Sequence, residues 1–176
     1  AGIMMLIVLQ MAAEANPVAS SADFMQVLGQ QKDSAILFAW LSGGAIAGGL
    51  VASVICARAI RLWVAHAGGI GIVAGCAALA FIPYGEPLFF VALTLTGFSA
   101  AGYLVPLNAR LQDRADDDKR GDVIAAGNLV DCFMGIVAVV LQGAMMSAGI
   151  SPQWQCASLA LLSALVASFL FFGKAE

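Results

Sequence analysis

Long apolar segments separated by short polar ones dominate the chain. Five of these segments carry no charge, or a single one, and are long enough to cross a membrane: residues 34–57, 62–82, 88–107, 123–148 and 154–172. About 20 apolar residues, each rising about 1.5 Å along a helix, span the roughly 30 Å hydrocarbon core of a bilayer. The pattern therefore predicts an all-α, polytopic bundle of transmembrane helices, forming a single transmembrane domain over residues 1–176.

The start of the chain allows two interpretations. Residues 1–13 are almost entirely apolar but too few to cross a bilayer alone, and Glu14, Asn16 and a proline then interrupt the run. Either a sixth span is truncated at its start, or it continues as a kinked helix over about residues 1–28 and ends at Gly29. The second interpretation places Glu14 and Asn16 deep in the membrane. Because the chain opens without an initiator Met or a basic leader, we expect it to begin within a longer protein.

The basic residues indicate an orientation. Six spans place seven of the eight basic residues on one side and leave only Lys32 on the other; the seven are Arg58, Arg61, Arg110, Arg114, Lys119, Arg120 and Lys174. Loops rich in Lys and Arg stay in the cytoplasm. We therefore expect a multi-pass protein of the cell inner (plasma) membrane, with its basic loops and its C-terminus cytoplasmic.

Composition agrees with a membrane protein and narrows the function classes. The chain is 61% hydrophobic and 11% charged, whereas a soluble domain averages about 45–50% apolar and about 25% charged residues. Four scattered cysteines form no CxxC pair, and no P-loop or HExxH motif occurs. His66 precedes the GFSA segment at residues 97–100, the reverse of the order in rhomboid proteases. We expect no enzymatic activity, cofactor, metal or nucleic-acid partner.

One predicted span carries a stripe of polar residues. Asn128, Asp131, Gly135 and Gln142 fall within about 60° of one another at about 100° per residue, and the opposite face is Val, Ile and Leu. An ionisable side chain in lipid costs roughly 2.5–3.5 kcal/mol or more, so this face is expected to look into a bundle or a cavity. The stripe either belongs to a substrate or ion path that also includes Glu14 and Asn16, or holds helices together by hydrogen bonds.

The stretch from Tyr103 to Cys132 contains the densest charge in the chain, and we interpret it as an aqueous loop between two spans. Asn108 and Gln112, four residues apart, would share a face at the cytoplasmic end of the preceding span. The basic residues of this side are either solvated groups that set orientation or members of an ion-pair gate; they are Arg58, Arg61, Arg110, Arg114, Lys119 and Arg120.

Two pairs of small residues predict close helix packing. Gly44 and Gly48 form a GxxxG pair in the span 34–57, and Gly71 and Gly75 form a second pair in the next span. In lipid, small residues four positions apart allow two helix backbones to approach closely.

Three segments resemble a known family: LGQQKDSAILFAWLSGGAIAGG, VPLNARLQDR and VIAAGNLVD. With six spans and a basic loop, they resemble the C-terminal half of a major facilitator superfamily transporter, and most specifically the bacterial lysophospholipid transporters. That family typically has Asn at the positions of Asn108 and Asn128 and an acidic residue at Asp131.

The resemblance implies a twelve-helix transporter with its substrate site between two six-helix halves. Its partners would be membrane lipids, a lysophospholipid substrate and the missing N-terminal half. Two alternatives stay open: a facilitator for a small metabolite or drug, and a non-transporting membrane domain of an acyltransferase fusion.

Overall fold

The computed structural model describes Ile7, Met11 and residues 24–57 and 61–172, with residues 24–34, 117 and 169–172 described in their backbone alone. Over these ranges the chain is helical and contains no strand. The elements in chain order are α2 (Phe24–Cys56), α3 (Leu62–Phe81), α4 (Pro87–Asp113), the short 3₁₀ helix η1 (Asp117–Lys119), α5 (Arg120–Ser147) and α6 (Pro152–Phe172).

Four of these helices are long and apolar enough to cross a membrane: Ala35–Cys56 within α2, and the whole of α3, α4 and α5. The helix α6 has 21 residues and closely matches the expected span 154–172. The all-helical membrane character predicted from the apolar pattern is therefore confirmed. A count of six spans is not established, because most of the predicted first span lies outside the described residues.

The helix α2 begins earlier than the apolar pattern indicates. It starts at Phe24, ten residues before the predicted boundary, and continues through Gly29 without a break. The prediction that Gly29 ends a helix is therefore wrong. The residues around it are Leu, Gln and Lys, which are good helix formers, and one interior glycine costs only about 1 kcal/mol relative to alanine. Polar residues extend this helix beyond its apolar part instead of forming a loop.

The stretch from Tyr103 to Cys132 is mostly helical and not an extended loop. The helix α4 passes through the buried Pro106 and ends at Asp113, and α5 begins at Arg120. The connection is thus only six residues long and includes the turn η1. The prediction failed because loss of apolar character marks where a span leaves the membrane, whereas Ala109 to Gln112 are residues that readily continue a helix.

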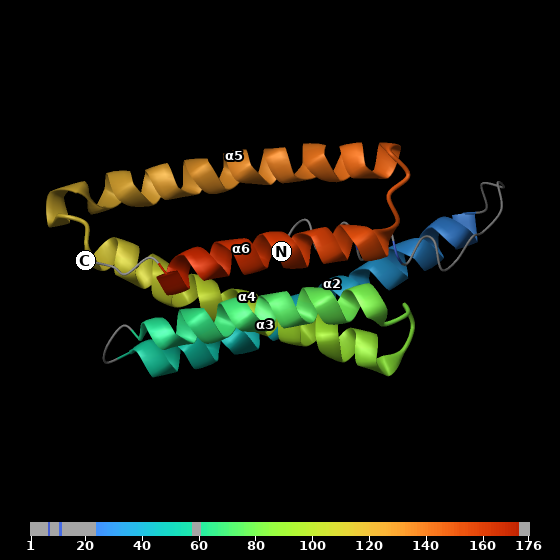
Figure 1. Ribbon diagram of the computed structural model, residues 1–176, viewed down its shortest axis with the longest axis horizontal. Coiled ribbons are helices and arrows are strands. Elements are labelled where there is room, and N and C mark those ends of the chain that lie inside the picture. The colour runs from blue at the N-terminus through green and yellow to red at the C-terminus, as the bar shows by residue number, and fades with distance from the viewer. Residues whose placement is uncertain (1–6, 8–10, 12–23, 58–60, 173–176) are drawn as a thin grey trace.

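Consecutive helices run antiparallel, and the helices form a packed group with one outlying member (Figure 1). The helix α4 packs against α2 and α3, and α3 packs against α6, whereas α5 lies along the outside and has few neighbours. The connections from α2 to α3 and from α4 to α5 lie at one end of the bundle, which we call the basic end. The connections from α3 to α4 and from α5 to α6 lie at the other end, which we call the Glu86 end.

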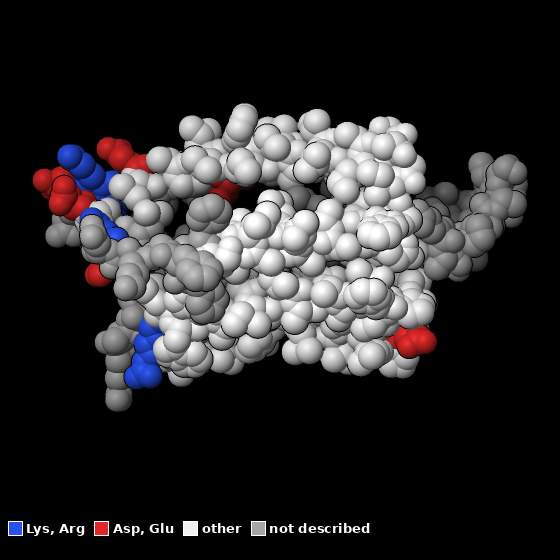
Figure 2. All heavy atoms as spheres, in the orientation of Figure 1, with Lys and Arg blue, Asp and Glu red and all other residues white. Residues whose placement is uncertain are grey.

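Charge is confined mainly to the ends of the molecule. On the face shown in Figure 2, blue Lys and Arg atoms appear at the basic end only, and the long middle is almost entirely uncharged. The buried core has no charged residue among its described members, and includes Leu37, Phe89, Leu93 and Cys156. This distribution is that of helices whose middle contacts hydrocarbon.

Glycines set the close approach of α4 to its two neighbours. A Cβ atom on Gly44 would overlap the carbonyl oxygen of Thr94, and one on Gly48 would overlap that of Phe98. On α3, Cβ atoms on Gly71 and Gly75 would overlap the hydroxyls of Ser99 and Thr96, respectively. All four glycines of the two predicted packing pairs therefore lie at close contacts with α4, the α2 pair against backbone atoms and the α3 pair against side-chain hydroxyls.

Candidate functional site

The polar stripe on α5 is divided between two environments. Gln142 is buried, with 3% of its surface exposed, whereas Asn128 and Asp131 are exposed. Gly135 lies between them, and a Cβ added there would meet no atom within 4 Å. The buried part of the stripe is thus near the C-terminal end of α5, and no helix among the described residues packs against its middle.

The whole stripe nevertheless faces the bundle. Gln142, Ala138 and Met145 line a cavity together with residues of α6, so their side of α5 is turned inward. At about 100° per residue, Asp131 lies only about 20° around the helix from Gln142. Asp131 is therefore on the inward face but is exposed, and none of the described helices covers it. Figure 2 shows a hollow between the α5 layer and the helices beside it.

A hydrogen-bonded pair of glutamines connects α5 to α6. The Nε2 group of Gln142 donates to Oε1 of Gln155, which has 1% of its surface exposed. Gln155 also donates from Nε2 to the carbonyl oxygen of Ile150, at 2.6 Å, in the turn between the two helices. This chain of hydrogen bonds pairs the Nε2 group of Gln142 and both polar atoms of the Gln155 amide, groups that would be costly to bury in a membrane unpaired. It holds one end of α5 against α6.

The cavity beside this pair has a volume of about 360 Å³ and is largely apolar. Ile7, Leu141 and Leu159 line it, together with the two glutamines. Ile7 is helical and buried, so this residue of the N-terminal segment lies against α5 and α6. The inward face of α5 thus passes from an amide-lined apolar cavity at Gln142 to an open carboxylate at Asp131.

The other end of α5 is held by a backbone contact to α4. The Nε group of Arg120 donates to the carbonyl oxygen of Gln112 at 3.3 Å. Gln112 and Asn108 are exposed on the last turns of α4, on one face as the spacing predicts. Arg110 lies in the last turn of α4, where its positive charge interacts favourably with the helix dipole, and Arg114 is the C-cap residue. The printed contact of Arg120 is to a backbone carbonyl, and the predicted ion-pair gate among these basic residues stays a prediction.

The remaining predicted site residues lie either at the exposed ends of helices or outside the described residues. Arg61 is the exposed N-cap residue of α3, and Lys119 is exposed at the end of η1. Arg58, Glu14 and Asn16 lie outside the described residues, so their predicted roles stay predictions. Among the described residues, no group of His, Cys, Asp and Glu is arranged to hold a metal ion.

Sequence reasoning missed Gln155 and Gly97. Gln155 is the partner that buries Gln142, and a signal was present, because it is a polar residue close to the start of an otherwise apolar span. Gly97 lies where a Cβ would overlap the carbonyl oxygen of Leu41, which makes it the α4 counterpart of the glycines on α2. Its role could not be read from spacing, because no glycine lies four positions before or after it to form a GxxxG pair.

Comparisons of the chain with protein-family models, curated proteins and solved structures find no match. The resemblance to lysophospholipid transporters therefore stays a prediction. The described part of the chain is a bundle of helices, four of them of membrane-spanning length and composition, with a largely apolar cavity beside Gln142 on α5.

Proposed function

We propose that this chain is the C-terminal six-helix half of a major facilitator superfamily transporter that moves lysophospholipid across the inner membrane by alternating access. The observation that carries the proposal is the position of Asp131, exposed on the bundle-facing side of a membrane-length helix. An ionisable residue at such a depth is costly unless a cavity or a partner accommodates it. The required partner surface would be the missing N-terminal half.

The few contacts that hold α5 support the proposal that this helix moves during transport. Hydrogen bonds join it to its neighbours near both ends, through Arg120 to α4 and through Gln142 to α6. Between these points Asn128, Asp131 and Gly135 have no described helix packed against them. A helix packed on all sides has many contacts to break when it moves, whereas α5 has few.

The chemistry of this face suits an amphiphile. A lysophospholipid needs polar groups for its headgroup and an apolar, laterally open surface for its single chain. The stripe of Asn128 and Asp131 offers an amide and a carboxylate, and the apolar cavity beside Gln142 lies on the same face of α5. The other faces of α5 expose Leu129, Phe133 and similar side chains that are compatible with lipid.

Transport of labelled lysophosphatidylethanolamine into proteoliposomes tests the proposal, with the full-length parent protein as wild type. Asp131→Asn keeps the size of the side chain and removes its charge. We expect it to slow uptake at least about tenfold, which corresponds to about 1.4 kcal/mol. Asp122→Asn is the matched control, because Asp122 is an exposed acidic residue in the first turn of the same helix. It should transport like wild type.

The outcomes separate the proposed function from its alternatives. Uptake that is equally fast in Asp131→Asn would remove the site assignment but keep the substrate class. A folded wild-type protein that moves no lipid would contradict the lipid-transport proposal and favour a facilitator for a small metabolite or drug. A protein that moves no solute at all would favour a non-transporting membrane domain.

A further inference from the structure

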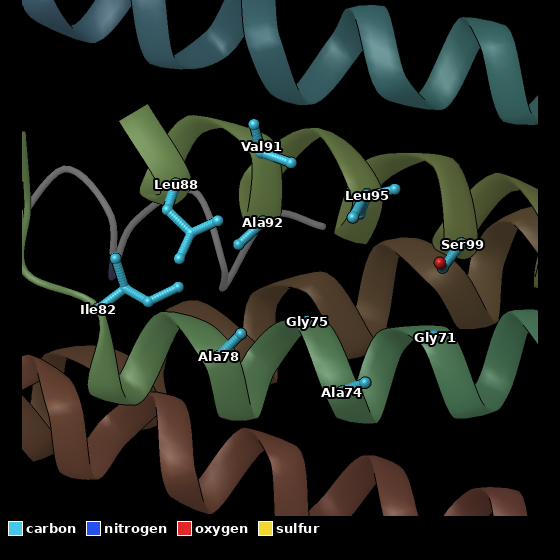
Figure 3. A pocket seen from close by; sticks show the side chains of 10 residues that line it. All are labelled: Gly71, Ala74, Gly75, Ala78, Ile82, Leu88, Val91, Ala92, Leu95 and Ser99. Carbon is cyan, nitrogen blue, oxygen red and sulfur yellow. The ribbon is translucent and has the colours of Figure 1, made fainter. Parts of the chain in front are cut away.

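A groove between α3 and α4 lies apart from the face of α5 described above. It has a volume of about 430 Å³, and Figure 3 shows the side chains that line it on the two helices. Ile82 and Leu88 lie at one end, and Ser99 at the other. Of the ten lining residues, only Ser99 has a polar side chain, so the groove is suited to hydrocarbon.

The length of the groove matches one leaflet of a bilayer. It extends from Gly71 to Ile82 along α3 and from Leu88 to Ser99 along α4, a separation of eleven positions on each helix. At about 1.5 Å per residue, each side is about 16 Å long. Half of a hydrocarbon core of about 30 Å is about 15 Å. A groove of this length that begins at the membrane surface, beside the turn from α3 to α4, would reach the middle of the bilayer.

The groove opens outward and has a floor of small residues. Leu88, Val91 and Leu95 on its α4 side are 48–59% exposed. On its α3 side, Ala74 is exposed, and Gly75 is buried where the two helices come closest. Since α3 and α4 are both long and apolar enough to span a membrane, the exposed apolar side chains of this opening are compatible with hydrocarbon. A hydrocarbon chain is therefore an occupant that suits the groove.

A charge at the mouth of the groove selects the headgroup. Ile82 and Leu88 lie at the two ends of the short turn from α3 to α4, and this turn contains the exposed Glu86. Among the side chains that the structure describes, Glu86 is the only charged one at this end of the bundle. A carboxylate at the membrane surface attracts an ammonium group and repels a headgroup with net negative charge.

We propose that the α3–α4 groove binds one acyl chain of a phospholipid with an ammonium-bearing headgroup, whose ammonium group pairs with Glu86. The lipid belongs to the leaflet at the Glu86 end. This inference does not rest on the transport proposal, because the groove uses no residue of α5. It assigns a lipid site that would exist whether or not the protein moves lipid.

The two parts of the site contribute differently. Lipid tails are as apolar as the groove, so van der Waals contact and shape, and not the hydrophobic effect, retain the chain. The headgroup pair is exposed, and such pairs contribute at most about 1 kcal/mol, which corresponds to a preference of about two- to fivefold. We therefore expect occupancy to depend on the groove and headgroup preference to depend on Glu86.

Native mass spectrometry of the full chain in detergent, titrated with phosphatidylethanolamine or phosphatidylglycerol, tests both parts. Ala74→Trp fills the groove from an exposed position, and we expect it to reduce the one-to-one phosphatidylethanolamine adduct about tenfold or more. Ala47→Trp is the matched control, because Ala47 is an exposed alanine on α2 that lines none of the described cavities. This variant should keep the adduct.

Glu86→Gln tests the headgroup without perturbing the fold, because Glu86 is exposed in a turn. We expect it to keep a lipid adduct but to lose the preference for phosphatidylethanolamine over phosphatidylglycerol. The proposal is overturned if Ala74→Trp and Ala47→Trp retain lipid equally, or if wild type shows no headgroup preference. The proposal is also overturned if the wild-type protein forms a dimer that excludes lipid and Ala74→Trp dissociates this dimer. The groove would then bind a second copy of the chain.

Discussion

Adding one methyl group at Gly44 tests the close contact between α2 and α4. A Cβ atom there would overlap the carbonyl oxygen of Thr94, which belongs to the backbone of α4 and cannot rotate away. The adjacent Gly43 is exposed on the same helix, and a Cβ on it would meet no atom within 4 Å. The pair Gly44→Ala and Gly43→Ala therefore makes the same chemical change in two environments.

The expected magnitude follows from two effects. Alanine in place of glycine stabilises a helix interior by about 0.5–1 kcal/mol, and this gain applies to both variants. Overpacking at a close contact costs about 1–3 kcal/mol, and it applies to Gly44→Ala alone. The free energies of unfolding of the two variants should therefore differ by about 1–3 kcal/mol, with Gly43→Ala at or slightly above wild type.

Unfolding in mixed detergent micelles, followed by circular dichroism, measures this difference. The additional change Thr94→Ala should not rescue Gly44→Ala, because the overlap is with backbone atoms and not with the threonine hydroxyl. Equal stability of Gly44→Ala and Gly43→Ala would refute the reasoning, since it would mean that α2 and α4 do not approach each other at this point. Rescue by Thr94→Ala would show that the side chain and not the backbone limits the approach.

Two further predictions concern the position of α5 and the orientation of the bundle. Gln155→Leu removes the acceptor of the Gln142 hydrogen bond and should lower the free energy of unfolding by about 0.5–2 kcal/mol. The control, Gln153→Leu, changes an exposed residue and should alter that free energy by less than about 0.5 kcal/mol. An equal effect of both variants would contradict a specific link between α5 and α6. In a chain without its native cysteines, a membrane-impermeant thiol reagent applied to whole cells should label Glu86→Cys, and should label Asp116→Cys only after the membrane is opened. The reverse pattern would invert the proposed orientation.

Much of the fold could be predicted, because the ability of a segment to span a membrane depends on its own length and composition. Residues 62–82 were predicted as a span and form α3 at Leu62–Phe81, since an uncharged segment of that length has few other stable states in lipid. Helix ends outside the apolar segments were predicted less well. The last turns of α4 and the first turns of α2 are polar and helical, and hydropathy does not distinguish a polar helix from a polar loop.

The candidate site could be predicted only in part. Helical spacing placed Asn128, Asp131, Gly135 and Gln142 on one face of α5, because that face is a property of a single helix. It could not show that Gln142 is buried against Gln155 while Asp131 remains exposed, because this difference depends on how closely α6 approaches along the length of α5.

The sequence alone determined that this protein is a set of apolar helices with charge concentrated at one end, because the length and composition of each segment decide whether it can lie in hydrocarbon. Tertiary structure alone decided which surfaces meet. It brought Gly44 against Thr94 and Gln142 against Gln155, and it left a leaflet-length groove between α3 and α4. The physical reason is that contact between helices depends on the shapes of two surfaces that are far apart in the chain, and no pattern within either helix contains that information.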